Sequence, residues 1–157
     1  MINVLALILL TTTPSVSVET AITIPINGYN LLYGSSLSVS TFLPLRVPIE
    51  PLLSVDLSSI KGDHDYFVRF FTIGLGVQSR IAKVKFGFRG ILSKVERKFG
   101  EGGDSGTAFG ARGLLNFYII KIGYFAGFLR LKVTTFLGKT RNLTVVSGGI
   151  GLEHNGF

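Results

Sequence analysis

The chain has 157 residues, a length that suits one domain with a sizeable core or a closed barrel. It combines 46% hydrophobic with only 16% charged residues, whereas about 25% charged is usual in soluble domains. The absence of cysteine excludes disulfides and thiolate metal sites. The net charge is +7, but the basic residues are scattered and no aromatic RNA-binding signature accompanies them, so we expect no nucleic-acid partner.

The N-terminal segment has the pattern of a secretory signal peptide. An apolar run extends from Val4 to Leu10, and Ser15-Val16-Ser17 supplies the small-x-small pattern of a cleavage site. No Lys or Arg precedes the apolar run, so a buried first strand is the alternative interpretation. We expect residues 1–17 to act as an export signal and residues 18–157 to form one folded domain.

Three strands with alternating apolar residues are expected between residues 18 and 58. In the first, Ile22, Ile24 and Ile26 alternate with smaller or polar residues, and Asn27-Gly28 is a strong signal for a hairpin turn. The pattern predicts, in order, a strand over 18–26, a strand over 29–40, a Pro-containing connection over 43–48, a strand over 49–58 and a polar loop over 61–65.

The clearest period-two pattern lies between Phe67 and Leu92. A period of two is that of a β-strand with one apolar and one polar face. One side carries Ala82, Val84, Phe86, Phe88 and Leu92, and the other carries Lys83, Lys85, Gly87 and Arg89. The two halves are separated by a short break at Gln78-Ser79-Arg80, which predicts an antiparallel hairpin with its turn there.

The second half of the chain continues the alternation after a hydrophilic stretch. The sequence predicts a mobile Gly-rich loop over 94–107, a strand over 111–119, a turn near Ile120-Lys121, a strand over 123–137, a turn over 138–142 and a last strand over 143–152. The connections alternate between longer polar segments and shorter ones. Eight strands joined in this way predict an all-β, antiparallel, up-and-down β-barrel that is transmembrane.

The distribution of charge indicates which face of the barrel points inward. A soluble barrel needs a polar exterior on every strand, yet much of the charge lies in the connections. The polar strand face is mostly Ser, Thr, Gly and Asn, which suits a narrow lumen in which the few ions must pair. The candidate site is therefore a network of lumen charges formed by Glu50, Asp56, Lys83, Lys85, Arg89 and Arg112.

With these features the chain resembles the small eight-stranded outer-membrane barrels of Gram-negative-type envelopes, the OmpA and OmpX sort. The terminal Phe157 is similar to the aromatic residue that these families use as an assembly signal, although Glu153 and Asn155 occupy positions where the family has apolar residues. The resemblance implies export to the outer membrane, contact with membrane lipids, and a structural or surface-interaction role. That role would be carried by loops 61–65, 94–107 and 138–142, and loop 94–107 is the candidate contact for an extracellular partner.

No catalytic constellation is evident, so we expect neither enzymatic activity nor a cofactor or metal. His64 lies between Asp63 and Asp65, which is more typical of a solvated turn than of a cation site. Ser147 and His154 are seven residues apart, which puts them on opposite faces of a strand and about 23 Å from each other. The Gly-rich segment 100–106 lacks the Lys-Ser/Thr pair of a phosphate-binding loop.

Two other classes of protein are compatible with the same pattern. One is a secreted soluble β-barrel or sandwich that binds an apolar ligand inside. The other is an extracellular fibre subunit whose apolar strand 18–26 completes the sheet of a neighbour. The sequence leaves the oligomeric state open.

Overall fold

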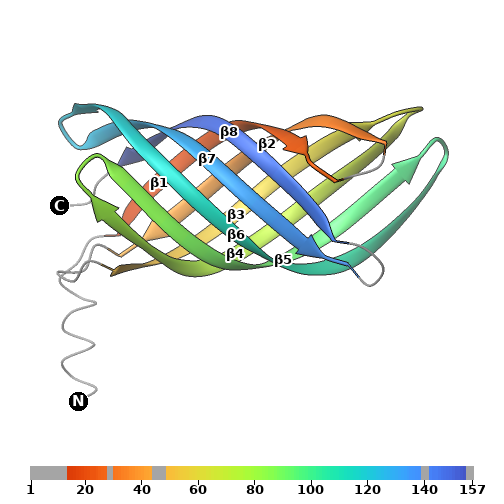
Figure 1. The fold of residues 1–157 in the computed structure, drawn as a ribbon, viewed down its shortest axis with the longest axis horizontal. Coiled ribbons are helices and arrows are strands. Elements are labelled where there is room, and N and C mark those ends of the chain that lie inside the picture. The colour runs from red at the N-terminus through yellow and green to blue at the C-terminus, as the bar shows by residue number, and fades with distance from the viewer. Residues whose placement is uncertain (1–13, 28–29, 44–48, 139–141, 155–157) are drawn as a thin grey trace, which may run out of the picture.

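A computed structural model describes residues 14–27, 30–43, 49–138 and 142–154. Those residues form eight antiparallel strands, in which each strand pairs with the next and β8 pairs with β1, so the sheet closes into a barrel (Figure 1). The strands are β1 (Ser15–Pro25), β2 (Leu31–Phe42), β3 (Ile49–Gly62), β4 (Tyr66–Ile81), β5 (Val84–Phe99), β6 (Gly102–Ile122), β7 (Phe125–Leu137) and β8 (Leu143–His154). The predicted eight-stranded up-and-down barrel is confirmed. Nowhere in the described ranges is there a helix long and apolar enough to span a membrane.

The connections divide the barrel into two ends. The β1–β2, β3–β4, β5–β6 and β7–β8 connections share one end, which we call the loop end. The β2–β3, β4–β5 and β6–β7 connections lie at the other end, together with the start of β1 and the finish of β8, and we call it the turn end. The ends to which the connections belong agree with the prediction, but the predicted alternation of lengths is wrong: residues 43–48 separate β2 from β3 at the turn end, whereas only two residues separate β5 from β6 at the loop end.

Two of the predicted turns are wrong in position. The β4–β5 turn lies at Ala82-Lys83 rather than 78–80, because Gln78 continues the inward alternation of β4 and is buried. The β6–β7 turn lies at Gly123-Tyr124 rather than near 120–121, and Gly123 adopts a φ of +57°, a conformation that glycine reaches without steric cost.

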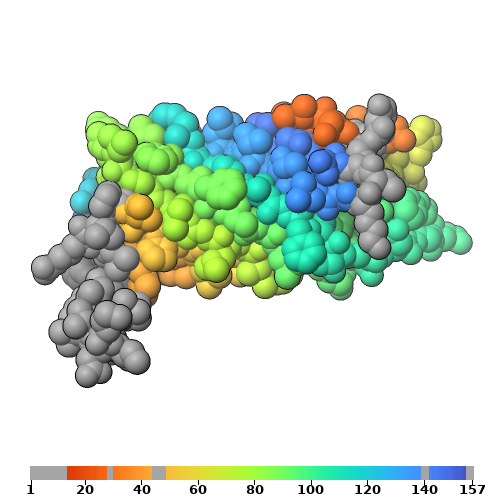
Figure 2. All heavy atoms as spheres, turned by 60° about the horizontal axis from the view of Figure 1, so that its bottom comes forward, coloured from red at the N-terminus to blue at the C-terminus, as the bar shows by residue number. Residues whose placement is uncertain are grey.

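The predicted mobile loop over 94–107 is also wrong. Strand β5 continues to Phe99 and β6 begins at Gly102, so that only two residues form the turn. Alternation persists there, with the buried Val95 between the exposed Lys94 and the half-buried Glu96. The β5–β6 hairpin reaches beyond its neighbours at the loop end, as its green tip shows at the right of Figures 1 and 2.

The predicted boundary between signal peptide and barrel falls inside β1. Ser15 pairs with Phe42, and Val16 pairs with both Thr41 and His154, so these residues belong to the sheet. The apolar run at 4–10 lies outside the described residues, and so does Gly28 of the predicted Asn27-Gly28 turn.

The barrel is apolar outside and polar inside. Phe86 and Phe88 are 43% and 59% exposed, whereas Lys85 and Arg89 are 2% and 0% exposed. Every strand contributes exposed apolar side chains to this outer belt, for example Ile22, Leu37, Leu57, Leu75, Phe88, Phe117, Leu131 and Ile150. Because side chains alternate across a strand, the same eight strands present their polar residues to the lumen.

Candidate functional site in the barrel lumen

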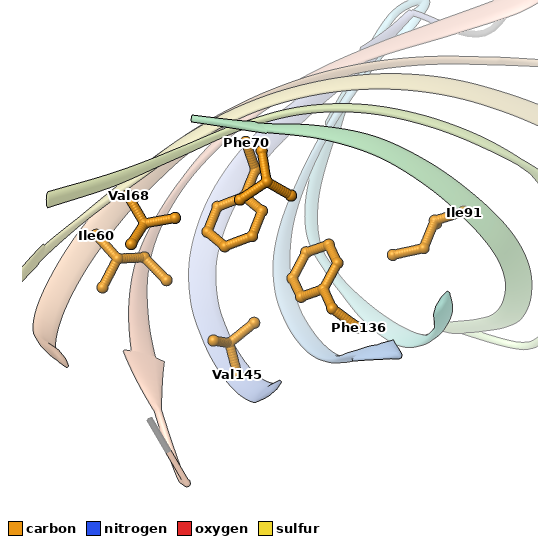
Figure 3. Packing of buried hydrophobic residues seen from close by; sticks show 7 residues of the cluster. Ile60, Val68, Phe70, Ile91, Phe136 and Val145 are labelled. Carbon is orange, nitrogen blue, oxygen red and sulfur yellow. The ribbon is translucent and has the colours of Figure 1, made fainter. Parts of the chain in front are cut away.

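The loop end of the lumen is filled by an apolar cluster. Phe70 of β4 and Phe136 of β7 stack across the interior with ring centroids 4.6 Å apart. Their neighbours in the cluster come from β3, β4, β5 and β8 and converge on the two rings (Figure 3). The complete set is Ile60, Val68, Phe70, Ile91, Val95, Phe136 and Val145. Packing of this kind excludes water, so it separates the deeper lumen from the loop end.

The middle of the lumen is an ionic layer. Arg112 of β6 reaches across the interior to Asp56 of β3, with Nη1 2.5 Å from Oδ2. Glu19 of β1 accepts two cations: Lys132, whose Nζ lies 2.5 Å from Oε1, and Arg130, whose Nη1 donates to Oε2. All five side chains are buried, and their pairing connects strands that are not neighbours in the sheet.

A second ionic group lies toward the turn end and is centred on Lys85. Its Nζ lies 3.3 Å from Glu153 Oε1 and 3.4 Å from Glu50 Oε2, and 3.8 Å from the centroid of the Phe42 ring. The hydroxyl of Tyr118 donates to Glu153, and Gln78 Nε2 donates to Glu50 over 3.0 Å. Each carboxylate is thus held by a cation and by a neutral donor.

Arg89 of β5 is the buried cation without a carboxylate. It is fully buried and lies in the same interior as the ionic layer, beside its direct sheet partner Arg112 of β6. No salt bridge reaches it among the described residues, and its one hydrogen bond is a long one of 3.4 Å from Nη1 to Ser40 Oγ. Its Nε and Nη2 have no acceptor in the described part of the chain.

The structure places most of the predicted charge network in the lumen. Glu50, Asp56, Lys85, Arg89 and Arg112 lie there, whereas Lys83 is exposed in the β4–β5 turn, where the strand alternation has ended.

Four buried ions were missed: Glu19, Arg130, Lys132 and Glu153. Arg130 and Lys132 alternate with Leu129, Leu131 and Val133, so the period-two pattern of β7 contained the signal for both. In β1, Glu19 likewise alternates with the outward-facing Val18, so the pattern also indicated that Glu19 faces inward.

Glu153 was missed because the sequence after Leu152 has no clear parity. Strand β8 continues to His154, and Glu153 points inward with 1% of its surface exposed. Residues Asn155 to Phe157, which include the terminal aromatic, lie outside the described residues.

The other candidate residues do not form a cluster, although Ser147 is the direct sheet partner of Lys132 in the lumen network. Ser147 is buried and hydrogen-bonds Thr23 Oγ1 over 3.0 Å, whereas His154 packs against the rings of Tyr124 and Phe125 at the turn end. His64 lies in the β3–β4 turn with a φ of +53°. No group of three metal-ligating side chains occurs within the described residues.

Comparison with known proteins identifies solved structures that have the same fold. No protein-family model matches the chain, and no curated protein matches it in sequence. Solved structures do match over almost the whole chain. Neisserial surface protein A matches with a TM-score of 0.69 and 12% identity, over 91% of this chain and 97% of that one.

Two further structures extend the comparison. Ail of Yersinia pestis, in complex with the heparin analogue sucrose octasulfate, matches with a TM-score of 0.61 and 11% identity, over 91% of this chain and 97% of that one. A major outer membrane protein of Thermus thermophilus matches with a TM-score of 0.58 and 13% identity, over 90% and 98%. The chain therefore has the fold of the small eight-stranded outer-membrane β-barrels. At these identities the similarity is one of fold alone.

Proposed function

We propose that the protein is a non-enzymatic barrel of the outer membrane with a structural or surface-interaction role. The observation that carries the proposal is the inverted polarity of the barrel, with a closed apolar belt outside and buried ions inside. A transmembrane barrel needs this arrangement, because apolar side chains are stable in contact with acyl chains, whereas polar side chains find no hydrogen-bond partners there. A soluble barrel of the same size would expose this belt to water, which favours aggregation.

The outer surface near the loop end has side chains that suit the edge of a membrane. Phe67 of β4 is flanked by Lys61 of β3 and Lys98 of β5, its direct partners in the sheet. The Arg69 guanidinium lies 5.0 Å and the Lys98 ammonium 5.7 Å from the centroid of the Phe67 ring. Aromatic and basic side chains in this arrangement suit the headgroup region at the edge of the apolar belt.

The β5–β6 hairpin is the surface that best suits a protein partner. Residues 102–108 of β6 pair with β5, whereas the pairing of β6 with β7 begins only at Phe109 in the described residues. The second edge of this segment therefore has backbone donors and acceptors that the described strands leave unpaired. An extended peptide from another protein can add to such an edge as a further strand. This hairpin replaces the predicted loop 94–107 as the candidate contact.

The two alternative classes fit the geometry less well. A barrel that binds an apolar ligand needs an apolar interior, and the central lumen described here is ionic. A fibre subunit needs a donor strand that is free to leave, yet β1 is paired on both edges, with β2 and with β8.

Cysteine labelling in native membranes tests the proposal. Phe88→Cys lies on the belt, Ser93→Cys in the lumen and Lys83→Cys in the exposed turn. We expect a water-soluble maleimide to label position 83 alone, and the unmodified protein to fractionate with membranes and to migrate differently on gels before and after heating. Equal labelling of positions 88 and 83 would show that the belt faces water, and the proposal would then be wrong.

A further inference from the structure

The central ionic layer contains more cations than carboxylates. Its carboxylates are Glu19 and Asp56, which are each 1% exposed. Its cations are Arg89, Arg112, Arg130 and Lys132, with exposed fractions of 0 to 4%. The other two lumen carboxylates, Glu50 and Glu153, share the single cation Lys85, so they offset one of the two excess positive charges and leave the other uncompensated.

Arg89 is the least compensated cation of this layer. Arg112 is paired with Asp56, and Arg130 and Lys132 share Glu19, which leaves Arg89 without a carboxylate among the described residues. Its Nε and Nη2 are donors without an acceptor there, and Asn116 Nδ2 in the same interior is a third. Asn116 is linked to the layer because its Oδ1 accepts a hydrogen bond from Arg130 Nε over 2.5 Å.

A buried guanidinium in this state requires compensation. Burial of an unpaired ion is strongly unfavourable, and a donor left without a partner adds a further penalty. Water molecules supply hydrogen-bond acceptors but no countercharge. The direct sheet partners of Arg89 are Gly76 of β4, which adds no side chain, and Arg112 of β6, which adds a second cation beside it.

We propose that a small monovalent anion of the halide class binds in the lumen against Arg89. The guanidinium supplies the charge and the free N–H donors of Nε and Nη2, and the Ser40 hydroxyl accepts a hydrogen bond from Nη1 on the other side of the group. One negative charge also balances the described part of the lumen, in which five cations (Lys85, Arg89, Arg112, Arg130 and Lys132) face four carboxylates (Glu19, Glu50, Asp56 and Glu153). The site does not depend on which membrane or compartment contains the barrel.

The first test is the anion dependence of stability in detergent micelles. The unfolding midpoint of the unmodified protein is measured in sodium chloride and in sodium gluconate at equal ionic strength. We expect the midpoint to rise with the logarithm of chloride concentration and to stay constant in gluconate, because a ligand that binds only the folded state stabilises it. A midpoint that is the same in both salts would overturn the proposal.

Two variants and a control assign the effect to Arg89. Arg89→Met removes the unpaired charge, and Ser40→Asp places a carboxylate beside it as an internal competitor. Both are expected to lose the chloride dependence, and Ser40→Asp is expected to remain at least as stable as the unmodified protein in gluconate. Lys83→Met makes the same charge change in the exposed turn and should retain the dependence. Chloride dependence that persists in both lumen variants would place the ion elsewhere and refute the site.

Crystals grown in bromide give the direct test. We expect an anomalous peak inside the barrel at hydrogen-bond distance from Arg89 Nε or Nη2, which is absent in Ser40→Asp. If bromide is found on the outer surface and none in the lumen, it is an adventitious ion only, and the proposal is contradicted.

Discussion

Lys85 connects parts of the chain that are distant in sequence. Glu153 comes from the last strand, Glu50 from the third and Lys85 from the fifth, and the three meet inside the barrel, largely shielded from water. Within such an interior an ion pair stabilises less than its short distances suggest, since both partners have lost their hydration. Removal of one partner has a larger effect than the pair itself, because the remaining charge stays buried.

Lys85→Met is therefore expected to destabilise the barrel by about 3–5 kcal/mol, since it leaves the buried carboxylate of Glu153 and the partly buried carboxylate of Glu50 without their cation. Urea unfolding in liposomes measures this change. The double variant Lys85→Met with Glu153→Gln should recover part of the loss. The control is Lys94→Met, which removes a cation from the exposed pair with Glu96 and should change stability little. Equal effects of Lys85→Met and Lys94→Met would show that the lumen is solvated.

At the level of elements, β7 and β8 pack closely where a glycine faces an aromatic ring. A Cβ at Gly151 would lie 2.2 Å from Phe128 Cζ, and Phe128 is 1% exposed. Gly151 is thus required by the ring that fills the space above it, and the contact fixes the two strands against each other.

Gly151→Ala is expected to destabilise the barrel by about 1–3 kcal/mol through overpacking. Gly148 is the matched control, because a Cβ there meets no atom within 4 Å. Gly148→Ala should be neutral in the same urea titration. If the two alanine variants unfold at the same urea concentration, the contact with Phe128 does not determine the packing of β8.

The accuracy of sequence-based prediction differed between strand faces and strand ends. Period-two alternation placed Phe86 and Phe88 outside and Lys85 and Arg89 inside, because one face of each strand meets a polar interior and the other does not. The ends were harder to predict. Ala82 turns with a φ of +53° although alanine is not a typical turn residue, so nothing local indicated that position.

The segment 94–107 shows why amino-acid composition led to the wrong prediction of a loop. Its glycines and charges are typical of a loop, yet the pairing of Lys94 with Thr107 and of Phe99 with Gly102 makes it a hairpin. The partner strand, rather than local propensity, decides the conformation of such a segment. Pairing across the lumen is equally non-local, which is why Arg112 could be placed inside from sequence but its partner Asp56 could not be assigned to it.

For the whole molecule, the decisive property is the continuous belt of exposed apolar side chains. Leu75 lies near the middle of β4 and is 69% exposed. If the belt contacts acyl chains, Leu75→Arg should cost about 2–4 kcal/mol of folding free energy in liposomes. Leu75→Ala should cost less, which a urea titration of both variants would measure. An arginine that is tolerated or stabilising at this position would be the behaviour of a water-exposed surface.

Because β1 and β8 are neighbours in the sheet and meet at the turn end, the first and last strands of the chain can be joined covalently. Val16 and His154 are paired neighbours in the sheet, so a linker of about two residues can join them as a tight hairpin does. Such a circular permutant can be opened between Gly100 and Glu101 without loss of any strand pair. We expect the permutant to fold into the same barrel and to migrate on unheated gels as the unmodified protein does. That result would establish that closure of the sheet, rather than the order in which the strands are covalently joined, determines the fold.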